Sequence, residues 1–220
     1  ARYAVYYTCP PGPLAEAGAA WLGWDIAAGR AVPHPAGIEG LAAHTETPRK
    51  YGFHGTLKPP FRLAPKATVE ALLGATEALA GSAKAFAVPR MQVAQLGRFL
   101  AIVPEGPDLP LSTLARRSVM DLDGFRAPLT EAELARRRKS ALSPAQEALL
   151  QEWGYPYVFE EFRFHITLSG RLEAPQPLLS AAQTYFSPLL KEPFPIDAIS
   201  LCGERADGRF QEIRRIALAA

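Results

Sequence analysis

Several features that would assign a protein to a functional class are scarce in this sequence. It has only two cysteines, Cys9 and Cys202, which lie far apart and match no metal-ligand spacing, so it indicates neither a disulfide framework nor a cysteine-bound metal. Its 24 lysine and arginine residues nearly balance its 22 aspartate and glutamate residues. The formal net charge of +2 is too small to argue for nucleic-acid binding by bulk electrostatics.

Long apolar runs are missing as well. No stretch approaches the roughly 20 apolar residues that span a bilayer. The first residues, Ala1 to Thr8, lack the uninterrupted apolar run of a signal peptide. We therefore expect a cytoplasmic protein without a membrane partner, in which the two thiols stay reduced and buried.

The composition is that of an ordinary globular protein. Hydrophobic residues make up 48% and charged residues 21% of the 220 positions. A chain of this length can build one sizeable hydrophobic core. We expect a single domain over residues 1–220, organised as two lobes.

Strand and helix patterns occur in both halves of the sequence, without the regular alternation of a doubly wound fold. This mixture favours an α+β fold with antiparallel sheets. Residues 29–48, rich in proline and glycine, are predicted to form a loop. The predicted strands cover 2–8, 51–57, 85–96, 98–103, 162–168, 196–202 and 210–218, and the predicted helices cover 14–24, 68–79, 111–121, two stretches after Pro128, and 176–190.

Local signals indicate where some of these elements begin and end. Thr130 with Glu133, and Ser143 with Gln146, are capping boxes that start the two helices after Pro128, and Gly154 ends the second. Gly81 is predicted to stop the helix over 68–79. The prolines at 59 and 60 are predicted to end the strand over 51–57.

The most informative feature is a short internal repeat. Residues 53–57 read Phe-His-Gly-Thr-Leu, and residues 164–168 read Phe-His-Ile-Thr-Leu. In a strand, residues two apart point to the same face, so the histidine and threonine of each copy project together while the phenylalanine and leucine face a core. A single His-x-Thr would indicate only a strand histidine, but its repetition with the same flanking residues favours a paired site.

Two such strands side by side would bring two imidazoles and two hydroxyls to one point, which suits a phosphoryl group. One imidazole of His54 and His165 can accept a proton while the other donates one to the leaving oxygen, and either ring can fill either role at this stage. The hydroxyls of Thr56 and Thr167 can donate to the non-bridging phosphate oxygens. This chemistry requires no metal and no cofactor.

The motifs resemble the signature of the 2H (two-histidine) phosphoesterase superfamily, which includes 2′-5′ RNA ligase-like proteins and cyclic nucleotide phosphodiesterases. The wider sequence resembles one bacterial branch, labelled as a phosphonate-metabolism protein after its gene neighbourhood. This resemblance extends over essentially the whole chain. The stretches that carry it are Arg2–Ala4, Trp21–Gly23, Pro48–His54, Lys58–Phe61, Phe125–Pro128 and Trp153–Tyr157.

The resemblance implies a bilobal α+β fold. Two pseudo-symmetric lobes, with antiparallel sheets flanked by helices, would each supply one motif strand to a central cleft. It implies that His54 and His165 are the acid/base pair of a hydrolase, and that Thr56 and Thr167 are its phosphate ligands. The motif implies no particular substrate.

Other residues are expected to support the site. Lys58 lies two residues after Thr56 and is predicted to bind phosphate as a point charge. The alternative is a solvated lysine at the end of the strand. Ser169 occupies the same position in the second copy. Tyr51, at the rim of the cleft, and Arg126 and Ser169 are predicted to contact the substrate.

The sequence also contains a basic run, Arg136 to Lys139, late in a predicted helix that begins with acidic residues. This order complements the helix dipole, which explains most of the run. The alternative is that Arg126 and one of these arginines grip a second phosphate. His54 and His165 lack a third His, Asp or Cys at ligand spacing, so no metal site is predicted.

These observations leave three functions open. The first is a metal-independent phosphoesterase for a small phosphorylated or cyclic phosphate metabolite, in phosphonate metabolism by the resemblance. The second is an RNA-end enzyme acting on 2′,3′-cyclic phosphates or 2′-5′ linkages, and the third is a phosphometabolite-binding protein without turnover. We expect a small substrate rather than a nucleic acid, because the net charge is low and the loop over 29–48 is long enough to cover a small ligand.

Overall fold

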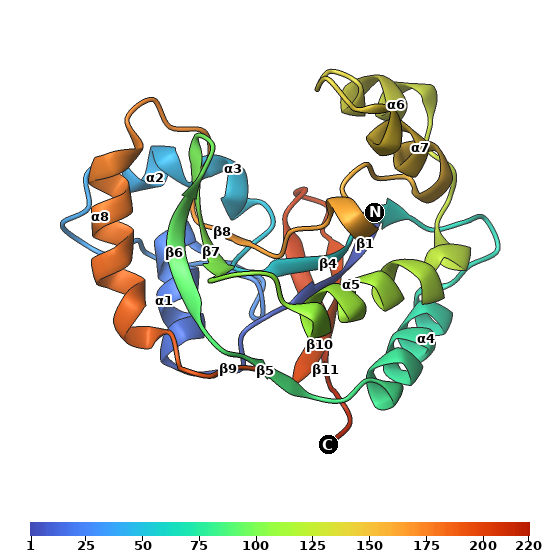
Figure 1. Cartoon of the computed structure of the whole chain (residues 1–220), viewed down its shortest axis with the longest axis horizontal. Coiled ribbons are helices and arrows are strands. Elements are labelled where there is room, and N and C mark those ends of the chain that lie inside the picture. The colour runs from blue at the N-terminus through green and yellow to red at the C-terminus, as the bar shows by residue number, and fades with distance from the viewer.

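A computed structural model describes all 220 residues and is organised around one seven-stranded antiparallel sheet (Figure 1). The strand order is β11-β10-β1-β4-β8-β7-β6. The predicted α+β class with antiparallel sheets is confirmed. The strands are β1 Arg2–Tyr7, β4 Gly55–Arg62, β6 Met91–Leu96, β7 Phe99–Pro104, β8 Ile166–Thr167, β10 Ala198–Glu204 and β11 Phe210–Ala217.

Two small ribbons and eight α-helices complete the fold. The ribbons pair β2 (Trp24–Asp25) with β3 (Arg30–Ala31), and β5 (Phe86–Val88) with β9 (Phe194–Ile196). Short 3₁₀ turns lie at Asp123–Phe125, Phe159–Glu161 and Ser187–Leu189. The helices are α1 Pro13–Leu22, α2 Leu41–His44, α3 Glu46–Arg49, α4 Val69–Ser82, α5 Leu109–Asp121, α6 Glu131–Arg137, α7 Pro144–Trp153 and α8 Pro175–Phe186.

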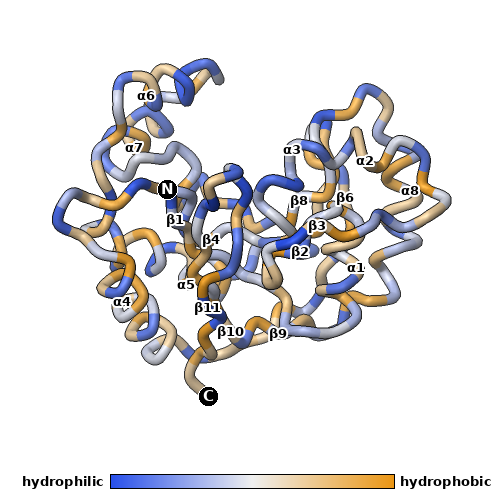
Figure 2. Tube along the Cα trace, turned by 180° about the vertical axis from the view of Figure 1, so that it is seen from behind, coloured by the Kyte–Doolittle hydropathy of each residue, from blue (hydrophilic) through white to orange (hydrophobic).

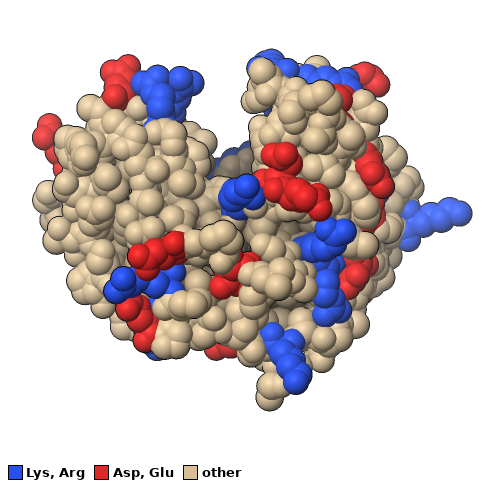
Figure 3. Space-filling model, viewed as in Figure 1, with Lys and Arg blue, Asp and Glu red and all other residues tan.

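The large sheet has two halves, which meet where the two motifs lie. Strands β11, β10, β1 and β4 form one half, covered by α4 and α5, and strands β8, β7 and β6 form the other, covered by α8. The halves are joined between β4 and β8 by a single residue pair, Gly55 opposite Ile166. The surface is hollowed between the resulting lobes (Figure 3).

The helices pack on the sheet through apolar residues at helical spacing. In α8, Leu178, Ala182 and Phe186 are four residues apart and buried, so they form one stripe against β6 and β7. Burying a leucine or phenylalanine side chain contributes roughly 1.5–3 kcal/mol. Figure 2 shows the same pattern from behind, with hydrophobic residues along inner segments such as β9 and β10.

One continuous core runs beneath both halves of the sheet. It contains 32 buried residues, among them Leu201 of β10 and Leu100 of β7, which lie in different halves. A second cluster of six buried residues lies on the opposite face of β1 and β10. Strand β1 separates the two, because Val5 points into the large core and Tyr6 into the small one. The small cluster supports the site described below.

Both predicted capping boxes are present, and Gly154 ends α7 in the left-handed conformation at φ 76°. The prediction that Gly81 stops a helix is wrong. Helix α4 continues to Ser82, and its last turn ends at Ala83 in an extended conformation. Gly81 lies inside the helix, and its φ is not the left-handed value that would end a helix. A Cβ at this position would meet open space.

The predicted strand over 51–57 is displaced in the structure. Strand β4 begins only at Gly55 and continues through Pro59 and Pro60 to Arg62. The prolines are tolerated because β1 shifts register there: Val5 lies opposite Lys58 but Tyr3 opposite Phe61, so two prolines face a single residue in a bulge.

Other boundaries differ as well. The strand predicted over 162–168 shrinks to β8, because the 3₁₀ turn at Phe159–Glu161 leads into it and only Ile166 and Thr167 pair with β7. The predicted loop over 29–48 contains β3, α2 and α3. None of the helices combines the length and the apolar character needed to cross a membrane.

Candidate active site

The centre of the sheet brings the two repeated motifs face to face. Gly55 pairs with Ile166 in antiparallel register, and this register places Thr56 opposite His165 and Thr167 opposite His54. Thr56 and His165 line the same cavity, of about 300 Å³, which we call the motif cavity. We call the four side chains the His–Thr quartet.

The two motifs differ at their middle residue, and the reason is steric. A Cβ on Gly55 would lie 2.4 Å from the ring of Phe164, which is buried and cannot move aside freely. In the other strand Ile166 is fully buried in the large core. The phenylalanine of the second motif therefore fills the space that a side chain in the first would need.

Gly55→Ala should therefore destabilise the protein and weaken the joint between the two halves of the sheet. Overpacking a core typically costs about 1–3 kcal/mol, and this is the loss we expect in the free energy of unfolding measured with urea. Gly74→Ala is the matched control. Nothing lies within 4 Å of a Cβ at this position in helix α4, so alanine should add about 0.5–1 kcal/mol through helix propensity. Equal behaviour of the two variants would contradict the packing argument.

Each histidine ring is fixed by the backbone just before it. His54 Nδ1 lies 2.8 Å from the carbonyl oxygen of Gly52, and His165 Nδ1 lies 2.8 Å from that of Arg163. A carbonyl can only accept, so each Nδ1 carries the hydrogen and donates. Nε2 is therefore the nitrogen of each ring that remains available to gain or lose a proton. The Thr56 hydroxyl lies 3.1 Å from His54 Nε2.

The environment of His54 favours its neutral form. Its ring stacks on Tyr6, with 3.8 Å between the ring centroids, and Tyr6 belongs to the small buried cluster. Burial lowers the pKa of His54 to about 4, the bond to the Gly52 carbonyl opposes this shift, and a charge on the nearby His165 lowers the pKa further. At neutral pH His54 is therefore a proton acceptor.

This shift predicts a pH dependence of stability. The pKa of His54 is about 4 in the folded protein against about 6.5 for an unperturbed histidine, so between these values the unfolded chain binds the extra proton. Stability contributed by neutral His54 should be complete above about pH 6.5 and fall as the pH drops toward 4. Urea unfolding at several pH values should show that the free energy of unfolding changes less steeply with pH in His54→Asn than in the wild type, between about pH 4 and 6.5. His44→Asn removes an exposed histidine and serves as the control. A slope unchanged in His54→Asn would disprove the burial effect.

Lys58 and Arg126 do not line the motif cavity. The Lys58 side chain is 2% exposed, and its Nζ lies 3.1 Å from the Val119 carbonyl oxygen and 3.3 Å from Asp123 Oδ1. Burial lowers the pKa of Lys58 to about 8, against the opposing effect of Asp123. Arg126 donates two hydrogen bonds to the same carboxylate, at 2.8 and 3.1 Å. Both cations line a cavity that adjoins the motif cavity. Their binding of a substrate phosphate stays a prediction.

Ser169 and Tyr51 take different positions around the quartet. The buried Ser169 hydroxyl accepts from the Leu100 N–H at 3.0 Å and donates to the Gly170 carbonyl at 2.8 Å, so both of its roles are used within the fold. It lines an open hollow together with Thr167. Tyr51 packs against Phe210 and lies 6.4 Å from the His54 ring, measured between centroids.

An aromatic wall of the motif cavity was not predicted from the sequence. Phe99 lies 5.9 Å from the His165 ring, between centroids. Further aromatic residues reach the cavity from the segment that follows α7. The exposure of the Tyr157 side chain, which would have pointed to this wall, is visible only in the structure. The wall residues are Phe99, Tyr155, Tyr157, Phe159 and Phe162.

The expectation that residues 29–48 cover the site is wrong. None of them lines the motif cavity or the adjoining cavity. The Gly170 N–H donates to the His44 carbonyl at 2.8 Å, and residues 37–40 line a different hollow together with Arg171 and α8. The α6–α7 segment and the residues after it form the wall instead (Figure 1). No three His, Cys, Asp or Glu side chains lie close enough together to hold a metal ion.

Comparison with known proteins places the chain in a family. Residues 56–211 match the model of a family described as protein of unknown function DUF1045. The chain belongs to the DUF1045 family. The match includes three residues of the quartet, Thr56, His165 and Thr167, and begins two residues after His54.

Two curated relatives of this DUF1045 chain are named ribose 1,5-bisphosphate phosphokinase PhnN. The protein from Janthinobacterium sp. (strain Marseille) is 40% identical over an alignment of 228 positions, gaps included, and this alignment covers 98% of this chain and 50% of the relative. The protein from Laribacter hongkongensis (strain HLHK9) is 34% identical over 196 residues, which is 87% of this chain and 46% of the relative. The chain thus spans about half the length of these relatives.

Solved structures similar to this chain include one titled as a phosphoesterase, with 16% identity and a TM-score of 0.47. Another is E. coli LigT complexed with 3′-AMP, with 17% identity and a TM-score of 0.46. Both alignments cover 100% of this chain and 98% of the other.

Proposed function

We propose that this chain is a 2H-type phosphoesterase that hydrolyses a small phosphorylated or cyclic phosphate metabolite without a metal ion. The observation that carries the proposal is the register of β4 and β8, which opposes Thr56 to His165 and His54 to Thr167. Two proton-transfer groups and two hydroxyl donors then surround one point, as an in-line attack on phosphorus requires.

The environments of the two rings suggest a division of roles. Neutral His54 would take a proton from the attacking water at Nε2 while the water oxygen forms a bond to phosphorus. His165 would donate a proton from Nε2 to the leaving oxygen as the old phosphorus–oxygen bond breaks. A cyclic phosphodiester would open to a phosphomonoester and a free hydroxyl, and the threonine hydroxyls would hold the non-bridging oxygens.

The motif cavity supports a small substrate. Its volume of about 300 Å³ lies at the lower end of the range for small-molecule sites, and its wall is largely aromatic and aliphatic. The name of the curated relatives contains a ribose bisphosphate, which is a small sugar phosphate. We do not extend the proposal to their phosphokinase activity, because this chain contains no Gly-x-x-x-x-Gly-Lys-Ser/Thr sequence of a P-loop.

A direct test is turnover of a 2′,3′-cyclic nucleotide followed by phosphorus NMR. We expect one phosphomonoester product, and we expect the rate to be the same with and without EDTA, because both catalytic groups are imidazoles. Activity lost with EDTA and restored by zinc or manganese would contradict the metal-independent mechanism. Tight binding without turnover would favour the non-catalytic phosphometabolite-binding protein.

Binding affinity measured at several salt concentrations, for a cyclic phosphodinucleotide and for a longer oligonucleotide, separates a small substrate from an RNA end. We expect additional nucleotides to add little affinity, and the affinity to fall only gently with salt, as one or two phosphate contacts predict. Affinity that rises with oligonucleotide length together with a steep salt dependence would favour the RNA-end enzyme.

A further inference from the structure

A second cavity adjoins the motif cavity and is strongly basic. Its volume is about 370 Å³, and its sides are the outer part of β4, from Lys58 to Arg62, and the α6–α7 segment. It shares the lining residues Pro59, Val119 and Val158 with the motif cavity, so the two spaces lie side by side. We call it the basic cavity.

The charges around the basic cavity do not balance. Seven lysine and arginine side chains line it, against the two carboxylates Glu133 and Glu204, with a third carboxylate, Asp123, behind them. Four positive charges therefore remain in excess. Such an excess in a partly enclosed space attracts anions, because the surrounding protein screens the charges less than water does.

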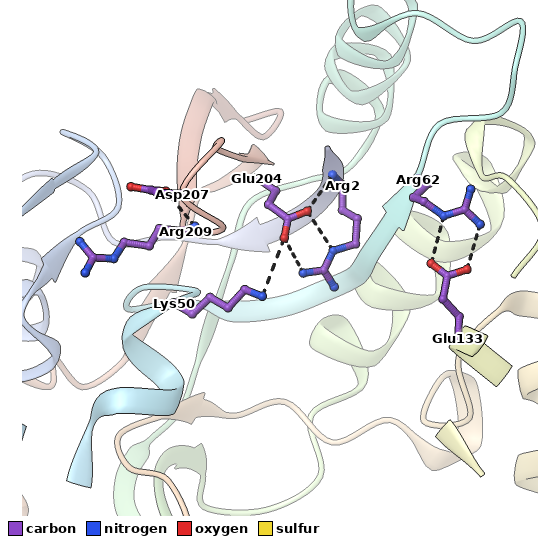
Figure 4. Close-up of polar contacts among 7 residues, drawn as sticks. All are labelled: Arg2, Lys50, Arg62, Glu133, Glu204, Asp207 and Arg209. Atoms are coloured by element: carbon purple, nitrogen blue, oxygen red, sulfur yellow. Dashed lines mark hydrogen bonds and ion pairs between the residues drawn. The ribbon is translucent and has the colours of Figure 1, made fainter. Parts of the chain in front are cut away.

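Every carboxylate at this cavity is already paired. Glu204 lies 2.8 Å from Arg2 and 3.8 Å from Lys50, and Glu133 accepts two hydrogen bonds from Arg62, at 3.0 and 2.8 Å (Figure 4). These pairs orient the basic groups but leave no carboxylate for the arginines of α6.

Arg136 and Arg137 are the two guanidinium groups without an acidic partner. Both line the basic cavity, and neither forms a salt bridge, although the next residue, Arg138, pairs with Glu147 at 2.6 Å. Arg137 lies over the ring of Tyr155, 4.7 Å from its centroid, and Tyr155 also lines the motif cavity. The helix-dipole account of this basic run is therefore incomplete.

We propose that the basic cavity binds a second phosphate of the substrate, through Arg136 and Arg137, and that the substrate is a small metabolite with two phosphoryl groups. This inference rests on the proposed function for the first phosphate only. Guanidinium groups suit a phosphate because they donate parallel hydrogen bonds to two of its oxygens.

Strand β4 gives a scale for the separation of the two cavities, because Thr56 lines the motif cavity and Lys58 to Arg62 line the basic cavity. At about 3.3 Å per residue, Lys58 lies roughly 7 Å and Arg62 roughly 20 Å beyond Thr56. A sugar that carries phosphoryl groups at opposite ends of one ring fits the near end of this range. A single phosphate would leave one of the two cavities unused.

Phosphate binding tests the site without relying on catalysis. In titration calorimetry with inorganic phosphate we expect two sites in the wild-type protein. R136Q/R137Q should weaken one of them roughly 10-fold or more, as the loss of charge-assisted hydrogen bonds predicts, and T56V/T167V should weaken the other. R30Q/K139Q removes two exposed charges away from both cavities and should change neither.

Turnover supplies the second measurement. Adenosine 2′,3′-cyclic phosphate with an added 5′-phosphate should have a KM roughly 10-fold or more below that of the same compound without it, and R136Q/R137Q should remove this difference. A single phosphate site that only T56V/T167V affects would overturn the basic-cavity site and leave the proposed function standing. Two phosphate sites with no turnover of either compound would instead reject the phosphoesterase and keep the second site. Wild-type behaviour of R136Q/R137Q in both assays would overturn the inference.

Discussion

His54→Ala and His165→Ala are each expected to lower turnover at least ~100-fold, because each removes one proton-transfer partner from the reaction. The two histidines directly precede the paired strands β4 and β8, and they cannot replace each other, since each ring is fixed by the backbone carbonyl two residues before it. The measurement is the steady-state rate on a 2′,3′-cyclic nucleotide. His44→Ala, which removes an exposed histidine outside both cavities, should keep the wild-type rate.

The leaving group separates the two histidines. If His165 protonates the leaving oxygen, its loss should matter far less for a p-nitrophenyl phosphodiester, whose leaving group needs little protonation. His54→Ala should remain equally impaired on both substrates, because the attacking water still has to lose a proton. If instead His54→Ala were the variant that recovers on the p-nitrophenyl substrate, the roles of the two rings would be exchanged. Near-wild-type rates of either variant on the cyclic nucleotide would reject the paired acid/base mechanism.

Thr56→Val and Thr167→Val are expected to reduce the rate on the order of 100-fold each, the usual effect of removing one hydrogen-bond donor to a developing oxyanion. Valine keeps the size of the side chain and removes only the hydroxyl. Thr56→Val should be the more harmful, because the same hydroxyl lies 3.1 Å from His54 Nε2 and helps to hold that ring.

Serine at the same positions provides the matched controls. Thr56→Ser and Thr167→Ser keep a hydroxyl and should retain most of the activity. If the valine variants were as active as the serine variants, the hydroxyls would have no part in holding the phosphate. The rate should be followed together with the unfolding temperature, so that a loss of fold is not mistaken for a loss of catalysis.

The arrangement of the motifs could be predicted from the sequence because it depends on a local rule. Alternation along a strand places His54 with Thr56 and buries Phe53 and Leu57, which are 4% and 2% exposed. The capping boxes were predictable for the same reason, since each involves residues three apart. The class of fold followed from the order of such local patterns.

Long-range features could not be predicted in this way. The register that opposes Gly55 to Ile166 depends on two strands more than a hundred residues apart. The burial of His54 depends on Tyr6 from a third strand, β1. Lys58 was predicted beside Thr56, but Asp123 and the Val119 carbonyl hold its ammonium group, and only the folded chain brings these groups together.

The division of the sheet also has a consequence for how the protein is made. The half that carries His54 takes its strands from residues 2–7, 55–62 and 198–217, while the other half takes its strands from residues 91–104 and 166–167. During synthesis on the ribosome, the first motif therefore leaves the exit tunnel long before two of the four strands of its own half exist. This half of the sheet therefore cannot be completed before the last strands have been synthesised. Catalytic competence should appear in a single late step, when residues 198–217 add to β1 and fix the strand on which His54 rests.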